Sequence, residues 1–98
     1  MTEVKEVECL IYGRVTGVMF RDFVCRRARQ LGLAGTVQNT ADRAVRVVAR
    51  GEELSLRRLV SYLEQGSLWS KVEKVEVVWR APATGGGQNE SKDFQIIY

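Results

Sequence analysis

The hydrophobic residues of this chain follow two alternating patterns, one with a period of two residues and one with a period of three to four. Runs of period two predict β-strands, and they cover residues 7–13, 33–39, 44–50, 72–79 and 94–98. Helical spacing predicts two helices, whose apolar stripes are Phe20, Phe23, Val24, Ala28 and Leu31, and Leu56, Leu59, Val60 and Leu63. Gly32 and Gly66 are placed to end these helices, and Gly51 is placed to open the second.

The order of these elements predicts the fold. Strand, helix and strand occur twice in succession, and a short extra strand follows at the C-terminal end. This order is that of two split βαβ units, so we expect an α+β, ferredoxin-like βαββαβ sandwich with both helices on one face of an antiparallel sheet. Residues 40–43 are expected to form a hairpin connection, and residues 81–92, with three consecutive glycines, a surface loop. We expect one domain over residues 1–98.

The composition excludes several classes of function, mainly because the chain contains no histidine and no long apolar run. The charged share of 28% and the net charge of +3 are those of an ordinary globular protein with a mild preference for anionic ligands. No apolar run is long enough to span a bilayer, so we expect a cytoplasmic protein without a membrane partner. A monomer is the simplest expectation. Histidine is absent, which removes the commonest general base and the commonest transition-metal ligand. We therefore expect no metal and no cofactor. Cys9 and Cys25 are expected to be buried and reduced.

Residues 13–21 form the candidate ligand-binding segment. Gly13 and Gly17 allow a tight turn between the first strand and the first helix, where unpaired N–H groups and the helix dipole favour an anion. Arg21 lies at this helix start, and its planar guanidinium suits the paired oxygens of a phosphate. Taken alone, the segment is more often a simple turn with a solvated arginine, and it is not a Walker A loop.

The predicted topology adds a second candidate residue. In a split βαβ unit the first two strands run in the same direction, so their C-terminal ends lie at the same edge of the sheet. Asn39 ends the second strand and is therefore expected near residues 13–21. Asparagine is also common at strand ends for reasons of turn geometry, and that alternative stays open.

Two spaced motifs resemble those of the acylphosphatase family. The first comprises Ile11, Gly13, Val15, Gly17, Val18, Phe20 and Arg21, with Thr16 where the family usually has glutamine. The second comprises Gly35, Val37, Asn39, Val45 and Gly51, with Thr36 in place of an aromatic residue and Arg43 in place of glycine. If position 43 needs a left-handed backbone, its arginine costs about 1 kcal/mol. Residues 94–98 also resemble the closing strand of the family.

The resemblance implies an enzyme that hydrolyses the carboxyl–phosphate bond of a small-molecule acyl phosphate without a metal. It implies that the phosphate is held by the backbone of Val15, Thr16, Gly17, Val18, Met19, Phe20 and Arg21 and by the Arg21 guanidinium. Asn39 would orient the attacking water. The chemistry suits a chain without histidine, because a carboxylate with a pKa of about 4 leaves without being protonated.

The fold and the charge of the chain also allow three other functions. An RNA-binding module of the same fold would expose aromatic residues on its third strand, and residues 44–50 contain none, so we expect no nucleic-acid partner. A non-catalytic or carbamoyl-phosphate-binding acylphosphatase-like module is the main alternative. A purely structural βαββαβ domain would require both motifs to be accidental.

Overall fold

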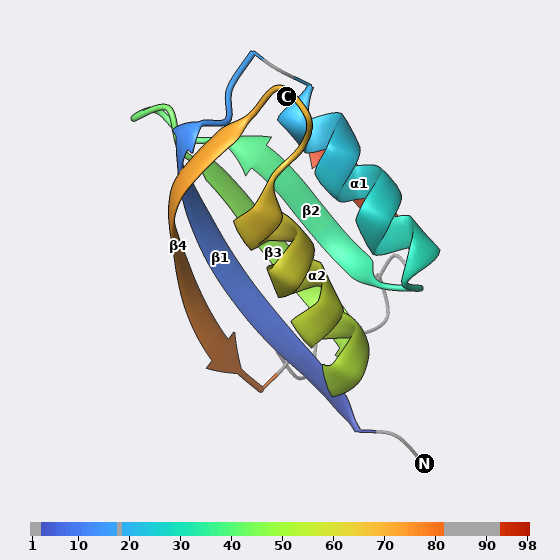
Figure 1. Cartoon of the computed structure of the whole chain (residues 1–98). Helices are drawn as coiled ribbons and strands as arrows, with labels where there is room; N and C mark the ends of the chain where they lie inside the picture. The colour runs from blue at the N-terminus through green and yellow to red at the C-terminus, as the bar shows by residue number, and fades with distance from the viewer. Residues whose placement is uncertain (1–2, 18, 82–92) are drawn as a thin grey trace.

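The structure is a computed structural model that describes residues 3–17, 19–81 and 93–98. Its elements, in the order shown in Figure 1, are β1 (Val4–Arg14), α1 (Phe20–Gln30), β2 (Ala34–Asn39), β3 (Val45–Glu52), α2 (Glu53–Gln65), β4 (Lys71–Arg80) and β5 (Phe94–Ile97). This order confirms the prediction from the hydrophobic pattern. Apart from Ala81, the surface loop predicted over residues 81–92 lies outside the described residues.

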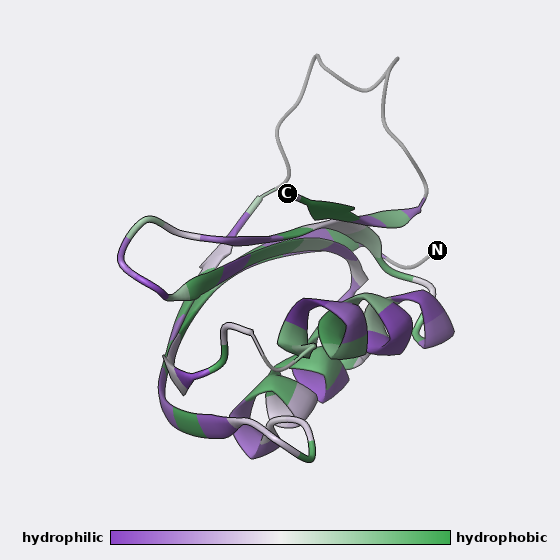
Figure 2. Ribbon diagram, turned by 90° about the horizontal axis from the view of Figure 1, so that it is seen from above, coloured by the Kyte–Doolittle hydropathy of each residue, from purple (hydrophilic) through white to green (hydrophobic). Residues whose placement is uncertain are grey.

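The sheet has the strand order β4-β1-β3-β2-β5. Strand β3 lies between β1 and β2 and is antiparallel to both, as the split βαβ topology requires, and β4 is antiparallel to β1. The short β5 pairs in parallel with β2, which makes the complete sheet mixed. Both helices cover the same face, as Figure 1 and the view from above in Figure 2 show. The ferredoxin-like fold is therefore confirmed.

The core lies between this covered face and the two helices. Alternate residues of β1, namely Val7, Cys9 and Ile11, are buried, and they pack with buried residues of both helices. The helix residues in this core are Phe20, Val24, Cys25 and Ala28 from α1 and Leu56, Leu59 and Leu63 from α2. Both cysteines are unpaired and buried, as predicted. Burial raises the pKa of the Cys9 thiol to about 12, so Cys9 acts as a small apolar side chain.

The other face of the sheet carries paired charges. Glu8 accepts hydrogen bonds from Arg46 at 2.6 Å and from Arg80 at 2.7 Å, and Arg80 also pairs with Glu6. The hydrogen bond from Arg46 is the main cause of the lowered pKa of the Glu8 carboxyl. Strand β1 begins at Val4, three residues before the predicted start, in a stretch where Lys5 and Glu6 interrupt the hydrophobic pattern.

Gly51 was predicted to open the second helix, and this was wrong. It lies inside β3, where it pairs with Lys5, and α2 begins at Glu53. The φ of 159° at position 51 is strained for other residues, and a Cβ atom there would lie 2.4 Å from Cδ2 of Leu33, so the position favours glycine.

Arg43 lies in the turn between β2 and β3 and has the left-handed backbone predicted to be unfavourable, with a φ of 67°. We expect Arg43→Gly to raise the free energy of unfolding by about 1 kcal/mol, because glycine adopts this conformation without steric cost. Urea unfolding followed by circular dichroism measures the change. The matched control is Arg58→Gly on the exposed side of α2, which we expect to destabilise by about 1 kcal/mol. Destabilisation by both variants would contradict the prediction.

Candidate active site

The backbone of residues 13–17 takes a path that glycine makes possible. Gly13 has a φ of 126°, and a Cβ atom there would lie 2.1 Å from the carbonyl oxygen of Lys71 in β4. Gly17 has a φ of 74° and open space around it, so its conformation rather than crowding favours glycine. Val15, between them, is buried and donates its N–H to the carbonyl of Gly13 at 3.0 Å. The two glycines thus let the chain leave β1 and turn toward α1.

Helix α1 begins with a residue that cannot cap it. Met19 occupies the N-cap position with φ 59° and ψ 25°, and no side chain makes a capping hydrogen bond there. The N–H of Phe23 donates to the Met19 carbonyl at 3.1 Å, which is the first i→i−4 hydrogen bond of the helix. In the described part of the chain, no hydrogen bond from the backbone N–H of Phe20 or Arg21 is seen. The start of α1 therefore offers donors and a positive dipole end to an anion.

A cavity of about 330 Å³ opens beside this helix start, and we name it the loop cavity. It is lined by Val15, Gly17, Met19, Phe20, Arg21, Asp22, Ile96 and Tyr98. Most of the residues predicted to bind phosphate therefore line one cavity. Thr16 is half-buried next to it, and Val18 lies outside the described residues.

Arg21 has a guanidinium with no carboxylate partner within the described ranges. Its central carbon lies 4.8 Å from the centroid of the Tyr98 ring. The neighbouring carboxylate of Asp22 instead pairs with Arg26 at 3.0 Å. A cation–π contact uses the face of the guanidinium and leaves its N–H edge available. Arg21 can therefore donate to two oxygens of a bound anion.

Asn39 ends β2 on the helix-covered face of the sheet. Its register partner is Val45, which in turn pairs with Ile11, so the three residues form one row across the strands. Residue alternation puts Asn39 on the same face as the buried Val37. With strands about 4.8 Å apart, Asn39 lies about 10 Å across the sheet from β1.

The side chain of Asn39 is exposed and does not line the loop cavity. Thr36, one of the departures from the family motif, lies on the opposite face.

A second cavity of about 460 Å³, which we name the α2-side cavity, was not predicted from the sequence. It is lined by Met19, Phe23, Arg26, Arg27 and the residues from Gly66 to Trp69. Leu68 and Trp69 in the connection between α2 and β4 are 86% and 74% exposed. Met19, also 74% exposed, lines both this cavity and the loop cavity.

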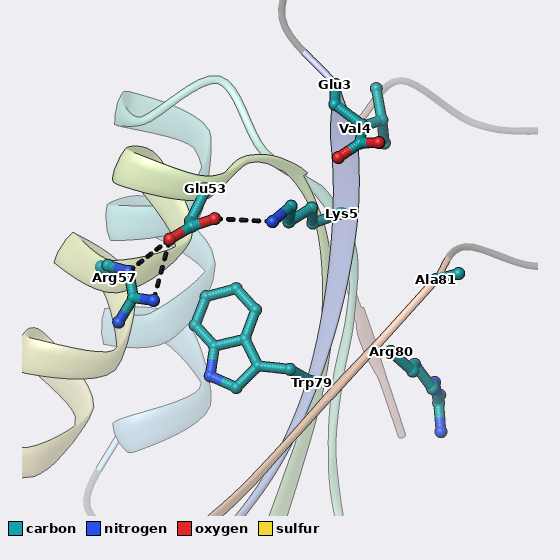
Figure 3. Close-up of a pocket in the computed structure, with 8 residues that line it drawn as sticks. All are labelled: Glu3, Val4, Lys5, Glu53, Arg57, Trp79, Arg80 and Ala81. Atoms are coloured by element: carbon teal, nitrogen blue, oxygen red, sulfur yellow. Dashed lines mark hydrogen bonds and ion pairs between the residues drawn. The ribbon is translucent and has the colours of Figure 1, made fainter.

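A third cavity, of about 440 Å³ and shown in Figure 3, lies at the other end of the sheet. Glu53 pairs there with Lys5 at 2.7 Å and with Arg57 at 2.8 Å, and Arg57 lies over the Trp79 ring. Lys5 and Arg57 therefore share one carboxylate. Lys5 and Arg14 lie near opposite ends of β1. At about 3.3 Å per residue they are about 30 Å apart, so this cavity is remote from residues 13–21.

Together the fold and the helix start define an α+β protein with a ferredoxin-like sheet and a candidate anion-binding loop at the edge of that sheet. The family model for acylphosphatase matches residues 7–96. The acylphosphatase of Roseiflexus sp. (strain RS-1) is 36% identical over 98 residues, the full length of both chains. The acylphosphatase of Koribacter versatilis (strain Ellin345) is 48% identical over 85 residues, which are 86% of this chain and 77% of the relative.

A solved structure agrees with these relatives. The crystal structure of acylphosphatase from Bacillus subtilis superposes with a TM-score of 0.86 at 34% identity, and it covers 96% of this chain and 99% of that one. This chain belongs to the acylphosphatase family, and its activity is that of an acylphosphatase. The prediction of an enzyme is thereby confirmed over that of a non-catalytic module. In the part of the chain that the structure describes, no helix is long and apolar enough to cross a membrane.

Proposed function

We propose that this protein hydrolyses the carboxyl–phosphate bond of a small acyl phosphate to a carboxylate and inorganic phosphate by in-line attack of water. The observation that carries the proposal is the Arg21 guanidinium, which lies without a carboxylate partner in the described chain, beside an uncapped helix start. A dianionic phosphoryl group would satisfy both features at once.

In this mechanism the phosphoryl group lies in the 13–21 segment. The Arg21 guanidinium and the backbone N–H groups of Thr16, Gly17 and residues 19–21 bind its oxygens. Val15 was also predicted to bind phosphate through its backbone, but its N–H donates to the Gly13 carbonyl, so in this proposal Val15 supplies only part of the cavity wall. These donors stabilise the charge that spreads over the phosphoryl oxygens in the transition state. Because they are held by the folded backbone, little reorganisation is needed when the reaction occurs.

Asn39 is proposed to orient the water. The water oxygen forms a bond to phosphorus while the bond from phosphorus to the acyl oxygen breaks, and the carboxylate leaves with that electron pair. A proton of the water passes to a phosphoryl oxygen of the substrate. The carboxylate needs no proton because the pKa of its acid is about 4. An amide with both a donor and an acceptor is enough for this role.

We also propose that residues 1–98 form a single domain that works as a cytoplasmic monomer without a bound cofactor. A net charge of +3 and a mixed charged surface fit a protein that takes up a small anion from solution.

The test follows benzoyl phosphate hydrolysis with and without EDTA. We expect turnover that the chelator does not change, and we expect Asn39→Ala to lower kcat by about a hundredfold or more, because the water is no longer aimed at phosphorus. The matched control is Gln38→Ala, which removes the neighbouring amide from the opposite face of β2 and is expected to retain activity. Turnover that stops in EDTA, or an equal loss in both variants, would contradict the mechanism.

A further inference from the structure

We propose that the α2-side cavity binds the acyl half of the substrate and selects acyl phosphates with a bulky, aromatic acyl group. This inference rests on the proposed function. The cavity adjoins the loop cavity, because Met19 lines both. A substrate with its phosphoryl group in the 13–21 segment can therefore extend past Met19 without leaving the protein surface.

The apolar residues of this cavity are exposed together. Met19, Leu68 and Trp69 are each at least 74% exposed, and the partly buried Phe23 lies behind them. Single exposed apolar residues are ordinary, but a group of large ones around a hollow marks a binding surface. A thioether, a branched aliphatic side chain and an indole are suited to contact with a flat ring.

The direction of in-line attack points the acyl group toward this cavity. The attacking water and the departing acyl oxygen lie on opposite sides of phosphorus. Asn39, proposed to hold the water, lies on β2, whereas β4 lies on the other side of β1 and β3 in the strand order. The connection that carries Leu68 and Trp69 leads into β4, and Figure 1 shows it crossing the same end of the molecule as the start of α1.

Two arginines, Arg26 and Arg27, lie at the rim of the α2-side cavity, and contacts within the protein fix their positions. Arg27 lies 4.5 Å from the Tyr62 ring centroid and 5.8 Å from that of Phe23, and Arg26 pairs with Asp22 at 3.0 Å. Arg27 has no carboxylate partner within the described ranges, so it adds positive potential at the cavity rim. That potential favours entry of a ligand that carries phosphate charge at one end and a ring at the other.

The experiment compares kcat/KM for benzoyl phosphate and acetyl phosphate. In Trp69→Ala and in Leu68→Ala we expect the ratio of the two values to fall about tenfold, with the value for acetyl phosphate unchanged within about twofold, because acetyl phosphate does not reach the cavity. The matched control is Leu54→Ala, which removes a leucine that is 72% exposed near the other end of α2 and is expected to keep the wild-type ratio.

A binding measurement separates this inference from the proposed reaction. The chain has two tryptophans, so in a Trp79→Phe variant the tryptophan fluorescence comes from Trp69 alone and reports on the α2-side cavity. We expect benzylphosphonate to change its fluorescence and inorganic phosphate at the same concentration to leave it unchanged. An unchanged substrate ratio in both cavity variants, an equal loss for both substrates, or equal fluorescence responses to both ligands would overturn the inference. Absence of turnover with either substrate in the wild-type protein would overturn the proposed function instead, while the fluorescence response still tests the cavity.

Discussion

Replacing Arg21 by glutamine is expected to lower kcat/KM for benzoyl phosphate by about a thousandfold or more. Arg21 brings a full positive charge and paired N–H donors to the loop cavity, and in the described residues no carboxylate competes for them. Glutamine keeps a donor but loses the charge and the fork geometry. Because Arg21 is only half-buried, the free energy of unfolding should change by less than about 1 kcal/mol. Steady-state kinetics and urea unfolding measure the two effects separately.

Two further variants make this prediction sharper. Arg21→Lys keeps the charge without the paired donors and should retain more activity than the glutamine variant, though less than the wild type. Arg57→Gln removes an arginine at the far end of the molecule, where it pairs with Glu53, and should retain full activity. A loss of less than tenfold in Arg21→Gln would show that the phosphoryl group is held by other residues.

A methyl group at Gly35 is expected to destabilise the protein by about 4 kcal/mol or more. A Cβ atom there would lie 1.9 Å from the carbonyl oxygen of Val48 in the neighbouring strand β3, and the φ of 145° is itself unfavourable for other residues. Since β2 and β3 pair along their length, the methyl group can be accommodated only if the strands separate. Natural stabilities are about 5–15 kcal/mol, so Gly35→Ala would leave little margin. The urea midpoint measures the loss.

Gly32→Ala is the matched control for this substitution. Gly32 also has a left-handed backbone, with a φ of 73°, but nothing lies within 4 Å of the position that its Cβ atom would take. Its expected cost is about 1 kcal/mol, from the backbone conformation alone. Equal destabilisation by the two variants would mean that the contact with Val48 does not determine the need for glycine at position 35.

Most of the fold could be predicted because local signals agree with the final structure. The apolar stripe from Phe20 to Leu31 and the stop at Gly32 indicated α1, which ends within one residue of that range. The prediction for Gly51 was wrong because a glycine favoured by its backbone conformation inside a strand looks the same in a sequence as a glycine that opens a helix. The start of β1 at Val4 was missed because Lys5 and Glu6 interrupt the apolar pattern. The charge partners of these two residues lie on α2, β3 and β4, which are distant in sequence.

The sequence carried signals for the proposed phosphoryl-binding residues but none for the proposed acyl-binding cavity. Glycine spacing and the position of Arg21 after a strand carried a signal for the phosphoryl side, and the topology brought Asn39 to the same end of the sheet. Leu68 and Trp69 carried none, because an exposed apolar residue in a connection cannot be told from a core residue by its type. Only the tertiary structure places them next to Met19.

The two edge strands of the sheet differ in length. One edge is the four-residue β5, and the other is the longer β4. Unpaired backbone groups along an edge can template aggregation by pairing with a strand of another molecule. Lys71, Glu73, Lys74 and Glu76 are all exposed along β4, and an incoming strand would have to desolvate their charges. This strand therefore disfavours edge-to-edge pairing with a strand of another molecule.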